Sequence, residues 1–187
     1  MQFIIDNIAA ILIYVTIAFA ITTLQIRTMT LTTETTIAYM SKKQTLEFAD
    51  VLEQEIKLIG TGTAEKITNI TTNADGQTTN FTFWWNDGVD DLEVEYRLIE
   101  TDIITVGGEE IQRYRMDRYV NGVINGGSPS TLRDFRIEPL DENGTPTGAA
   151  TAVMVRAQVV NTYPMGDPDK MLIGRTFWGM TLLPMNL

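Results

Sequence analysis

The chain of 187 residues contains no cysteine and no histidine. Their absence excludes disulfide bonds, zinc sites built from thiolate or imidazole, cysteine nucleophiles and catalytic triads with an imidazole base. The sequence also has no serine in a nucleophile-elbow motif, and no glycine-rich segment with the Gly-Lys-Ser/Thr ending of a phosphate loop. We therefore expect a protein that is not an enzyme and that has no cofactor.

Basic residues are few, with 14 lysines and arginines against 24 aspartates and glutamates, for a net charge of -10. An acidic surface repels phosphate backbones, so we expect no nucleic-acid partner. Apolar residues make up 44% of the chain, enough for a folded core. The length suits one ordinary domain plus an extended element.

Glycine and proline are missing from the first part of the chain, where the earliest are Gly60 and Pro129. Nothing therefore breaks a helix through residue 59. Residues 3–24 are almost wholly apolar, and about 20 such residues at 1.5 Å each span a bilayer core of roughly 30 Å. The segment lacks the basic start and the cleavage site of a signal peptide, so we expect it to belong to the working protein, with any basic leader already missing.

Two parts of this helix are predicted, an apolar part at 1–26 and an amphipathic part at 27–59. In the second part the apolar positions have mostly helical spacing: Ile37, Met40, Phe48, Val51, Leu52, Ile56 and Ile59. The threonine-rich stretch 28–36 predicts a kink, because β-branched residues have weaker helix propensity. A helix of ~55 residues is roughly 80 Å long, so one end must project from the rest.

Asp6 is the only charge in the apolar run, and a carboxylate in a lipid-exposed helix is usually retained for a partner. That partner is the terminal ammonium of a neighbouring chain if helices pack together; otherwise Asp6 is an interfacial or capping residue. Small residues, including Ala18, let helices approach closely. The predicted assembly residues are Phe3, Asp6, Ala9, Ala10, Leu12, Ile13, Ile17 and Ala20. A plain single-pass anchor followed by a separate helix is the alternative.

Residues 60–187 are predicted to form a β-rich head. After a loop at 61–79 with one short strand at 66–71, period-two segments follow at 80–85, 92–100, 111–120, 132–138, 153–161 and 173–183. Turn signals such as Asn121-Gly122 separate them. The fold class is therefore α+β, a long N-terminal helix packed against an antiparallel sheet.

Four segments of the chain resemble the type IV pilin superfamily, especially minor pilins and the pseudopilins of type II secretion. They are the N-terminal FIID (3–6), the helix end LEFADVLEQEIKLIG (46–60), the pair DLEVEYRLIE (91–100) and IQRYRMDRYVNGV (111–123), and the ending TFWGMTLLPMNL (176–187). The resemblance covers nearly the whole chain. Asp6 takes the place of the family's glutamate if the mature chain starts at Gln2, and the family's C-terminal disulfide loop is absent.

The resemblance implies a pilus-like filament outside the cell. A prepilin peptidase and assembly machinery would process an inner-membrane precursor, whose helices then pack into a homopolymer with heads outward. Open alternatives are a low-copy minor pilin or pseudopilin of a secretion system, a monomeric membrane-anchored binding domain, and a viral tube component.

Two acidic turns and three glycosylation triplets each have a structural interpretation beside the functional one. Asp87, Asp90 and Asp91, and the segment 166–170, are oxygen-rich turns that suit calcium, but without EF-hand spacing solvated turns are favoured. Asn69, Asn80 and Asn143 begin glycosylation triplets, expected to be bare, with Asn143 the best exposed.

The aromatic residues of the head and its arginines are expected to be structural. The aromatic set favours packing over a ligand platform, and comprises Phe81, Phe83, Trp84, Trp85, Phe177 and Trp178. The arginine set is expected to form ordinary salt-bridged faces, and comprises Arg113, Arg115, Arg118, Arg133 and Arg136.

Overall fold

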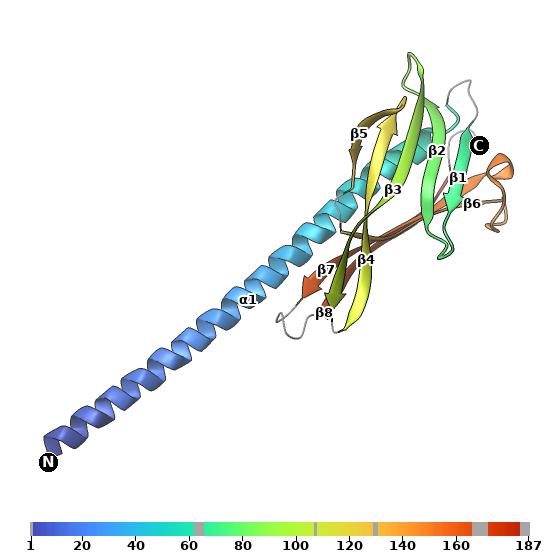
Figure 1. Cartoon of the computed structure of the whole chain (residues 1–187). Helices are drawn as coiled ribbons and strands as arrows, with labels where there is room; N and C mark the ends of the chain where they lie inside the picture. Colours follow the sequence, from blue (N-terminus) through green and yellow to red (C-terminus); the bar gives the residue numbers. More distant parts are fainter. Residues whose placement is uncertain (1, 62–65, 107, 129–130, 166–171, 184–187) are drawn as a thin grey trace.

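A computed structural model describes residues 2–61, 66–106, 108–128, 131–165 and 172–183. One long helix projects from a head of antiparallel strands (Figure 1), which confirms the predicted α+β class. The elements in the described residues are α1 (Gln2–Leu58), β1 (Ile67–Thr72), β2 (Thr78–Asn86), β3 (Asp91–Val106), β4 (Glu109–Val120), β5 (Val123–Gly127), β6 (Leu132–Leu140), the 3-10 turn η1 (Ala149–Thr151), β7 (Met154–Met165) and β8 (Leu172–Leu182).

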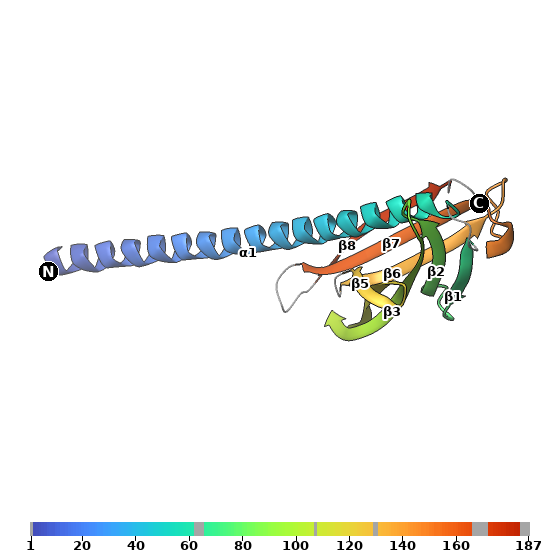
Figure 2. The ribbon, with the colours of Figure 1, turned by 90° about the horizontal axis from the view of Figure 1, so that it is seen from above.

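The strands form one sheet in the order β1-β2-β3-β4-β6-β7-β8, with β5 paired to β4. β4 and β6 meet at a single pair of residues, Tyr114 and Leu132, whereas the other neighbours pair along much of their length. The sheet therefore bends sharply at this joint into two leaves. Figure 2 shows β7 and β8 running beside α1, whereas β1 and β3 extend away from it.

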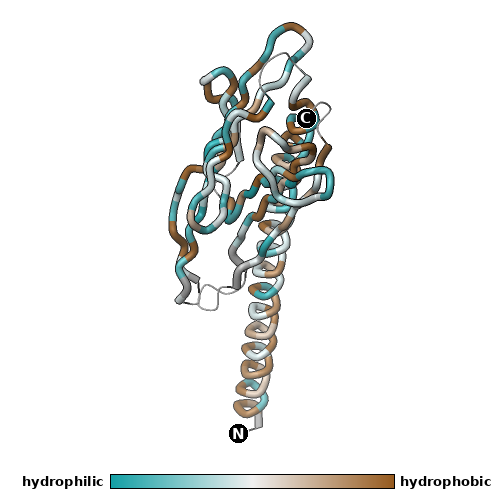
Figure 3. The backbone as a smooth tube through the Cα atoms, turned by 90° about the vertical axis from the view of Figure 1, so that its right-hand side faces the viewer, coloured by the Kyte–Doolittle hydropathy of each residue, from teal (hydrophilic) through white to brown (hydrophobic). Residues whose placement is uncertain are grey.

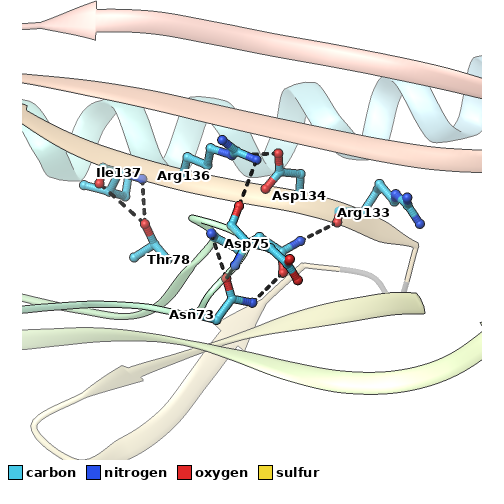
Figure 4. Close-up of polar contacts among 8 residues, drawn as sticks. Asn73, Asp75, Thr78, Arg133, Asp134, Arg136 and Ile137 are labelled. Carbon is cyan, nitrogen blue, oxygen red and sulfur yellow. Dashed lines mark hydrogen bonds and ion pairs between the residues drawn. The ribbon is translucent and has the colours of Figure 1, made fainter. Parts of the chain in front are cut away.

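Side-chain hydrogen bonds also tie the two leaves together between β6 and the start of β2 (Figure 4). The backbone N–H of Ile137 on β6 donates to the Thr78 hydroxyl of β2 at 2.8 Å. The Gln77 amide donates to the Arg133 carbonyl at 3.0 Å. These bonds give the leaves a second connection besides the β4–β6 joint, and the buried core lies between the two leaves and α1.

The C-terminal part of α1 supplies the remaining wall of the core. Phe48, Leu52, Ile56 and Ile59 are buried against residues of both leaves, among them Tyr96. Their spacing of four, four and three residues places the first three on one face of α1, and Ile59 continues that face just after the helix ends. The predicted apolar set was right for these four, whereas Val51 and Met40 are exposed and Ile37 is half-buried. α1 therefore contacts the head only with its last five turns or so.

The kink predicted at 28–36 is absent, because α1 runs as one helix from Gln2 to Leu58. The threonine hydroxyls of this stretch bond to carbonyls one turn earlier in the helix, for example Thr32 to Thr28 at 2.8 Å. Because each hydroxyl finds its partner inside the helix, it does not compete for an alternative backbone conformation. That prediction was wrong.

The predicted strands are all present, with shifted ends. β3 continues to Val106 and β7 to Met165, each beyond the predicted end. β5 (Val123–Gly127) was not predicted, because it is short and contains two glycines. It follows the expected Asn121-Gly122 turn, in which both residues have positive φ (48° and 76°), as a two-residue type I′ hairpin requires.

Candidate assembly surface

The N-terminal two-thirds of α1 is uncovered. No side chain from Phe3 to Met40 is buried, and most large apolar residues there are exposed, such as Phe3 (79%) and Leu12 (65%). Figure 3 shows the hydrophobic colouring of this rod below the head. By length and composition α1 is able to cross a membrane. All of the predicted assembly residues lie in this exposed segment: Phe3, Asp6, Ala9, Ala10, Leu12, Ile13, Ile17 and Ala20.

The hydroxyl groups of the threonines on the uncovered rod are hydrogen-bonded within α1 itself. Each hydroxyl donates a hydrogen bond to the backbone carbonyl four residues earlier, and eight of the nine bonds are 2.8–3.0 Å long. The threonines are Thr16, Thr22, Thr23, Thr28, Thr30, Thr32, Thr33, Thr35 and Thr36. The outward surface of such a residue is largely its methyl group. Buried hydroxyls need partners, and these already have them. The rod is thus suited to a water-free environment as far as Thr36, although its sequence looks polar after residue 27.

A buried polar cluster fixes α1 to the head. Glu55 faces the sheet and accepts hydrogen bonds from the Tyr96 hydroxyl of β3 and the Arg118 guanidinium of β4, the latter through Nε at 2.9 Å. Burial, and then the Glu55 carboxylate, raise the pKa of Tyr96 well above its usual 10.0, so the phenol stays protonated as a donor. Asn161 of β7 adds a bond to the Thr45 hydroxyl at 2.6 Å.

Sequence reasoning missed the role of Glu55, although the chain carries a signal for it. Glu55 lies seven residues after Phe48 and three after Leu52, on the stripe that contacts the core. An acid on an apolar stripe needs a buried partner. Arg118 was predicted only as part of a salt-bridged face; Arg113, Arg115 and Arg136 do pair with carboxylates.

A cleft of about 500 Å³ lies beside this cluster, between α1 and the β4–β5 hairpin. Phe48, Val51 and Tyr96 form much of its wall, and the backbone of Asn125 to Gly127 forms its rim. Arg118 also lines it, but this guanidinium is engaged by Glu55 and by the Asn125 carbonyl at 2.9 Å. The cleft therefore offers a mostly apolar wall and no free charge from this cluster.

The three calcium candidates occupy the β2–β3 turn. One Asp87 oxygen accepts the backbone N–H groups of Val89 and Asp90, both at 2.9 Å, and the Asn86 amide donates to Asp91. The Asp90 N–H, followed by that of Val89, lowers the pKa of Asp87. Within the described residues no group of three or more acidic side chains is placed to hold a metal. Segment 166–170 lies outside the described residues, and solvated turns without calcium stay the expectation for both segments.

The glycosylation candidates differ in their surroundings. Asn143 is exposed in the turn after β6, as expected. Asn69 on β1 is exposed, while Asn80 on β2 is half-buried, with its side-chain oxygen accepting from Thr82 at 2.9 Å. Asn69 and Asn143 are therefore both open to a modifying enzyme, and Asn80 is less so.

The aromatic residues are divided between core and surface. Phe81 and Phe83 are buried in the core, with ring centroids 4.8 Å apart. Trp85 and Trp178 are partly buried and pack against this core, and Trp84 is half-buried. Phe177 alone of this set is mainly exposed, at 64%.

Comparison of the chain with protein-family models, with curated proteins and with solved structures finds no match. The long apolar helix and the antiparallel sheet are compatible with a pilin-like fold.

Proposed function

We propose that this chain is a structural subunit of a pilus-like filament, in which the projecting parts of α1 pack together as the core and the heads face outward. The observation that carries the proposal is the rod from Phe3 to Met40, apolar on its surface and uncovered by its own head. Large exposed apolar surfaces mark sites of protein or membrane contact. The proposed function has no catalytic step and no cofactor.

The length of the rod favours packing against copies over residence in a membrane alone. Residues 3–36 extend about 50 Å at 1.5 Å per residue, longer than a hydrocarbon core of roughly 30 Å. The threonine hydroxyls are satisfied along the part that exceeds the membrane. Removing ~1,000 Å² of this surface from water contributes tens of kcal/mol before ordering costs, at about 25 cal/mol per Å².

A second candidate is a membrane-anchored, monomeric domain. It is favoured by the stretch from Asn7 to Ile26, which has no charged residue and matches one bilayer in length. In the filament proposal the same stretch holds the precursor in the inner membrane before assembly. Export to the cell surface as a filament is part of the first proposal only.

The two candidates separate on removal of detergent. Full-length protein is purified in detergent, dialysed without lipid, and followed by light scattering and negative-stain imaging. A chain of residues 27–187 is the matched control, since residues 3–26 contribute nothing to the buried core. We expect thin filaments of uniform width from the full chain and monomers from the control. Filaments formed by the control, or a full chain that stays single in every condition, would contradict the proposal.

A further inference from the structure

Three charged residues interrupt the rod: Asp6, Arg27 and Glu34 are the only ones among the first 41 residues. Within the described residues none of them has an ion pair or hydrogen bond to another side chain. Asp6 and Arg27 are exposed and Glu34 is half-buried. A charge that enters a water-free helix core without a partner is strongly unfavourable, so a core built from these rods must pair them.

The three charges are separated by multiples of seven residues, 21 from Asp6 to Arg27 and 7 from Arg27 to Glu34. At 1.5 Å per residue these intervals are about 31 Å and about 10.5 Å along the helix. Such distances exclude pairing within one straight helix. At 3.6 residues per turn all three project within about 80° of one another, so they lie along one side of the rod.

Copies in a helical array turn the same side toward the common axis, and residues of that side meet where their heights agree. An array without stagger would place each of the three charges beside its own copies, which repel. A copy shifted by seven residues instead places its Glu34 at the height of a neighbour's Arg27. A copy shifted by three times seven residues in the opposite direction places its Asp6 at the height of the same Arg27.

We propose that these charges set the stagger of the filament, with successive copies offset by seven residues, about 10.5 Å along the axis. Each Arg27 then lies between the Glu34 of its first neighbour on one side and the Asp6 of its third neighbour on the other. A guanidinium has five N–H donors and accommodates two carboxylates. The inference depends on the proposed filament, and assigns the partner of Asp6 to a guanidinium of another copy of this chain.

Cysteine cross-linking measures the stagger directly, because the natural chain has no cysteine. Asn7→Cys, Thr28→Cys and Thr35→Cys stand next to the three charges and leave them in place. Chains with single substitutions are mixed in detergent, assembled by dialysis and oxidised with copper–phenanthroline, and linked peptides are identified by mass spectrometry. We expect 7–28 and 28–35 disulfides between copies. Asn7→Cys mixed with Leu24→Cys, four residues off the register, is the matched control and is expected to link poorly.

Charge reversal tests whether the pairs determine assembly. Arg27→Glu places three carboxylates at one height, and we expect it to raise the concentration needed for assembly by roughly tenfold or more. The triple variant Asp6→Lys, Arg27→Glu, Glu34→Lys restores every pair with signs exchanged and is expected to assemble close to wild type. Failure of the triple variant to recover would overturn the proposed pairing.

The two proposals fail in different ways. If wild-type filaments form but the disulfides are 7–7 and 28–28, the filament proposal stands and the stagger is wrong. If no filaments and no disulfides form in any mixture, both are wrong, since the stagger has no filament to act in.

Discussion

The Nε of Arg118 donates a hydrogen bond of 2.9 Å to Glu55 across 63 residues of sequence, and so joins β4 to the inner face of α1. The same carboxylate accepts the hydroxyl of Tyr96. Both acid and guanidinium are largely shielded from water, with side-chain exposures of 8% and 15%. This cluster holds the helix in one rotational setting on the head, and therefore determines which side the projecting rod turns toward other copies.

Glu55→Ala is expected to destabilise the head by about 3 kcal/mol, because it leaves the Arg118 guanidinium shielded and unpaired. The measurement is urea unfolding of residues 27–187. Glu53→Ala is the matched control, since Glu53 pairs only with the exposed Lys57 on another face of α1 and is expected to change stability by about 0.5 kcal/mol or less. Equal losses of unfolding free energy for the two substitutions would show that the Glu55 cluster stabilises the head no more than a surface ion pair.

Acid should weaken one interaction on the sheet surface. Two 2.6 Å hydrogen bonds from Arg97 hold the pKa of Glu95 below its usual 4.5, although partial burial opposes this. Because the pKa is lower in the folded state, the stabilisation is present above pH 4.5 and is lost as pH falls through the folded-state pKa. The stability difference between wild type and Glu95→Gln should therefore shrink below pH 4.5 in urea unfolding. A difference that grows with acid would contradict this sign.

Gly127 is required by the close approach of β5 to β4. Its φ is +150°, and a Cβ atom there would lie 2.0 Å from the Met116 carbonyl oxygen. We expect Gly127→Ala to destabilise the head by roughly 2–3 kcal/mol in urea unfolding. Gly122→Ala is the control, because its Cβ would meet open space and only the positive φ of 76° is strained. A smaller cost at Gly127 than at Gly122 would contradict the observed hairpin.

The threonines of the rod should tolerate loss of the hydroxyl. Thr32→Val keeps the branched shape and removes only a group that bonds within α1, so we expect filament assembly to be unchanged. Thr32→Lys places a charge on the same surface and should abolish assembly. Negative-stain imaging after detergent removal compares them. Assembly by the lysine variant would show that this part of the rod stays in water.

The sequence predicted local features well and distant partnerships poorly. Leu92, Val94, Tyr96 and Leu98 alternate with charged residues, and this period predicted the strand at 92–100, which the structure shows as β3 with Val94 and Tyr96 buried. The kink predicted at 28–36 was wrong because helix propensity counts the cost of β-branching. It does not count the hydrogen bonds of the threonine hydroxyls to the helix backbone. The partner of Glu55 follows from the β3–β4 register, which brings Tyr96 opposite Arg118, and no local pattern contains that register.

The central claim is that the apolar rod becomes the water-free core of an assembly, and single cysteines report on this directly. Ile17→Cys lies on the rod and Val89→Cys on an exposed turn of the head. Both are treated with a water-soluble maleimide after detergent removal without lipid. We predict that in assembled protein Ile17→Cys reacts at least roughly tenfold more slowly than Val89→Cys, equivalent to about 1.4 kcal/mol of protection. Equal labelling rates at the two positions in assembled protein would contradict the account.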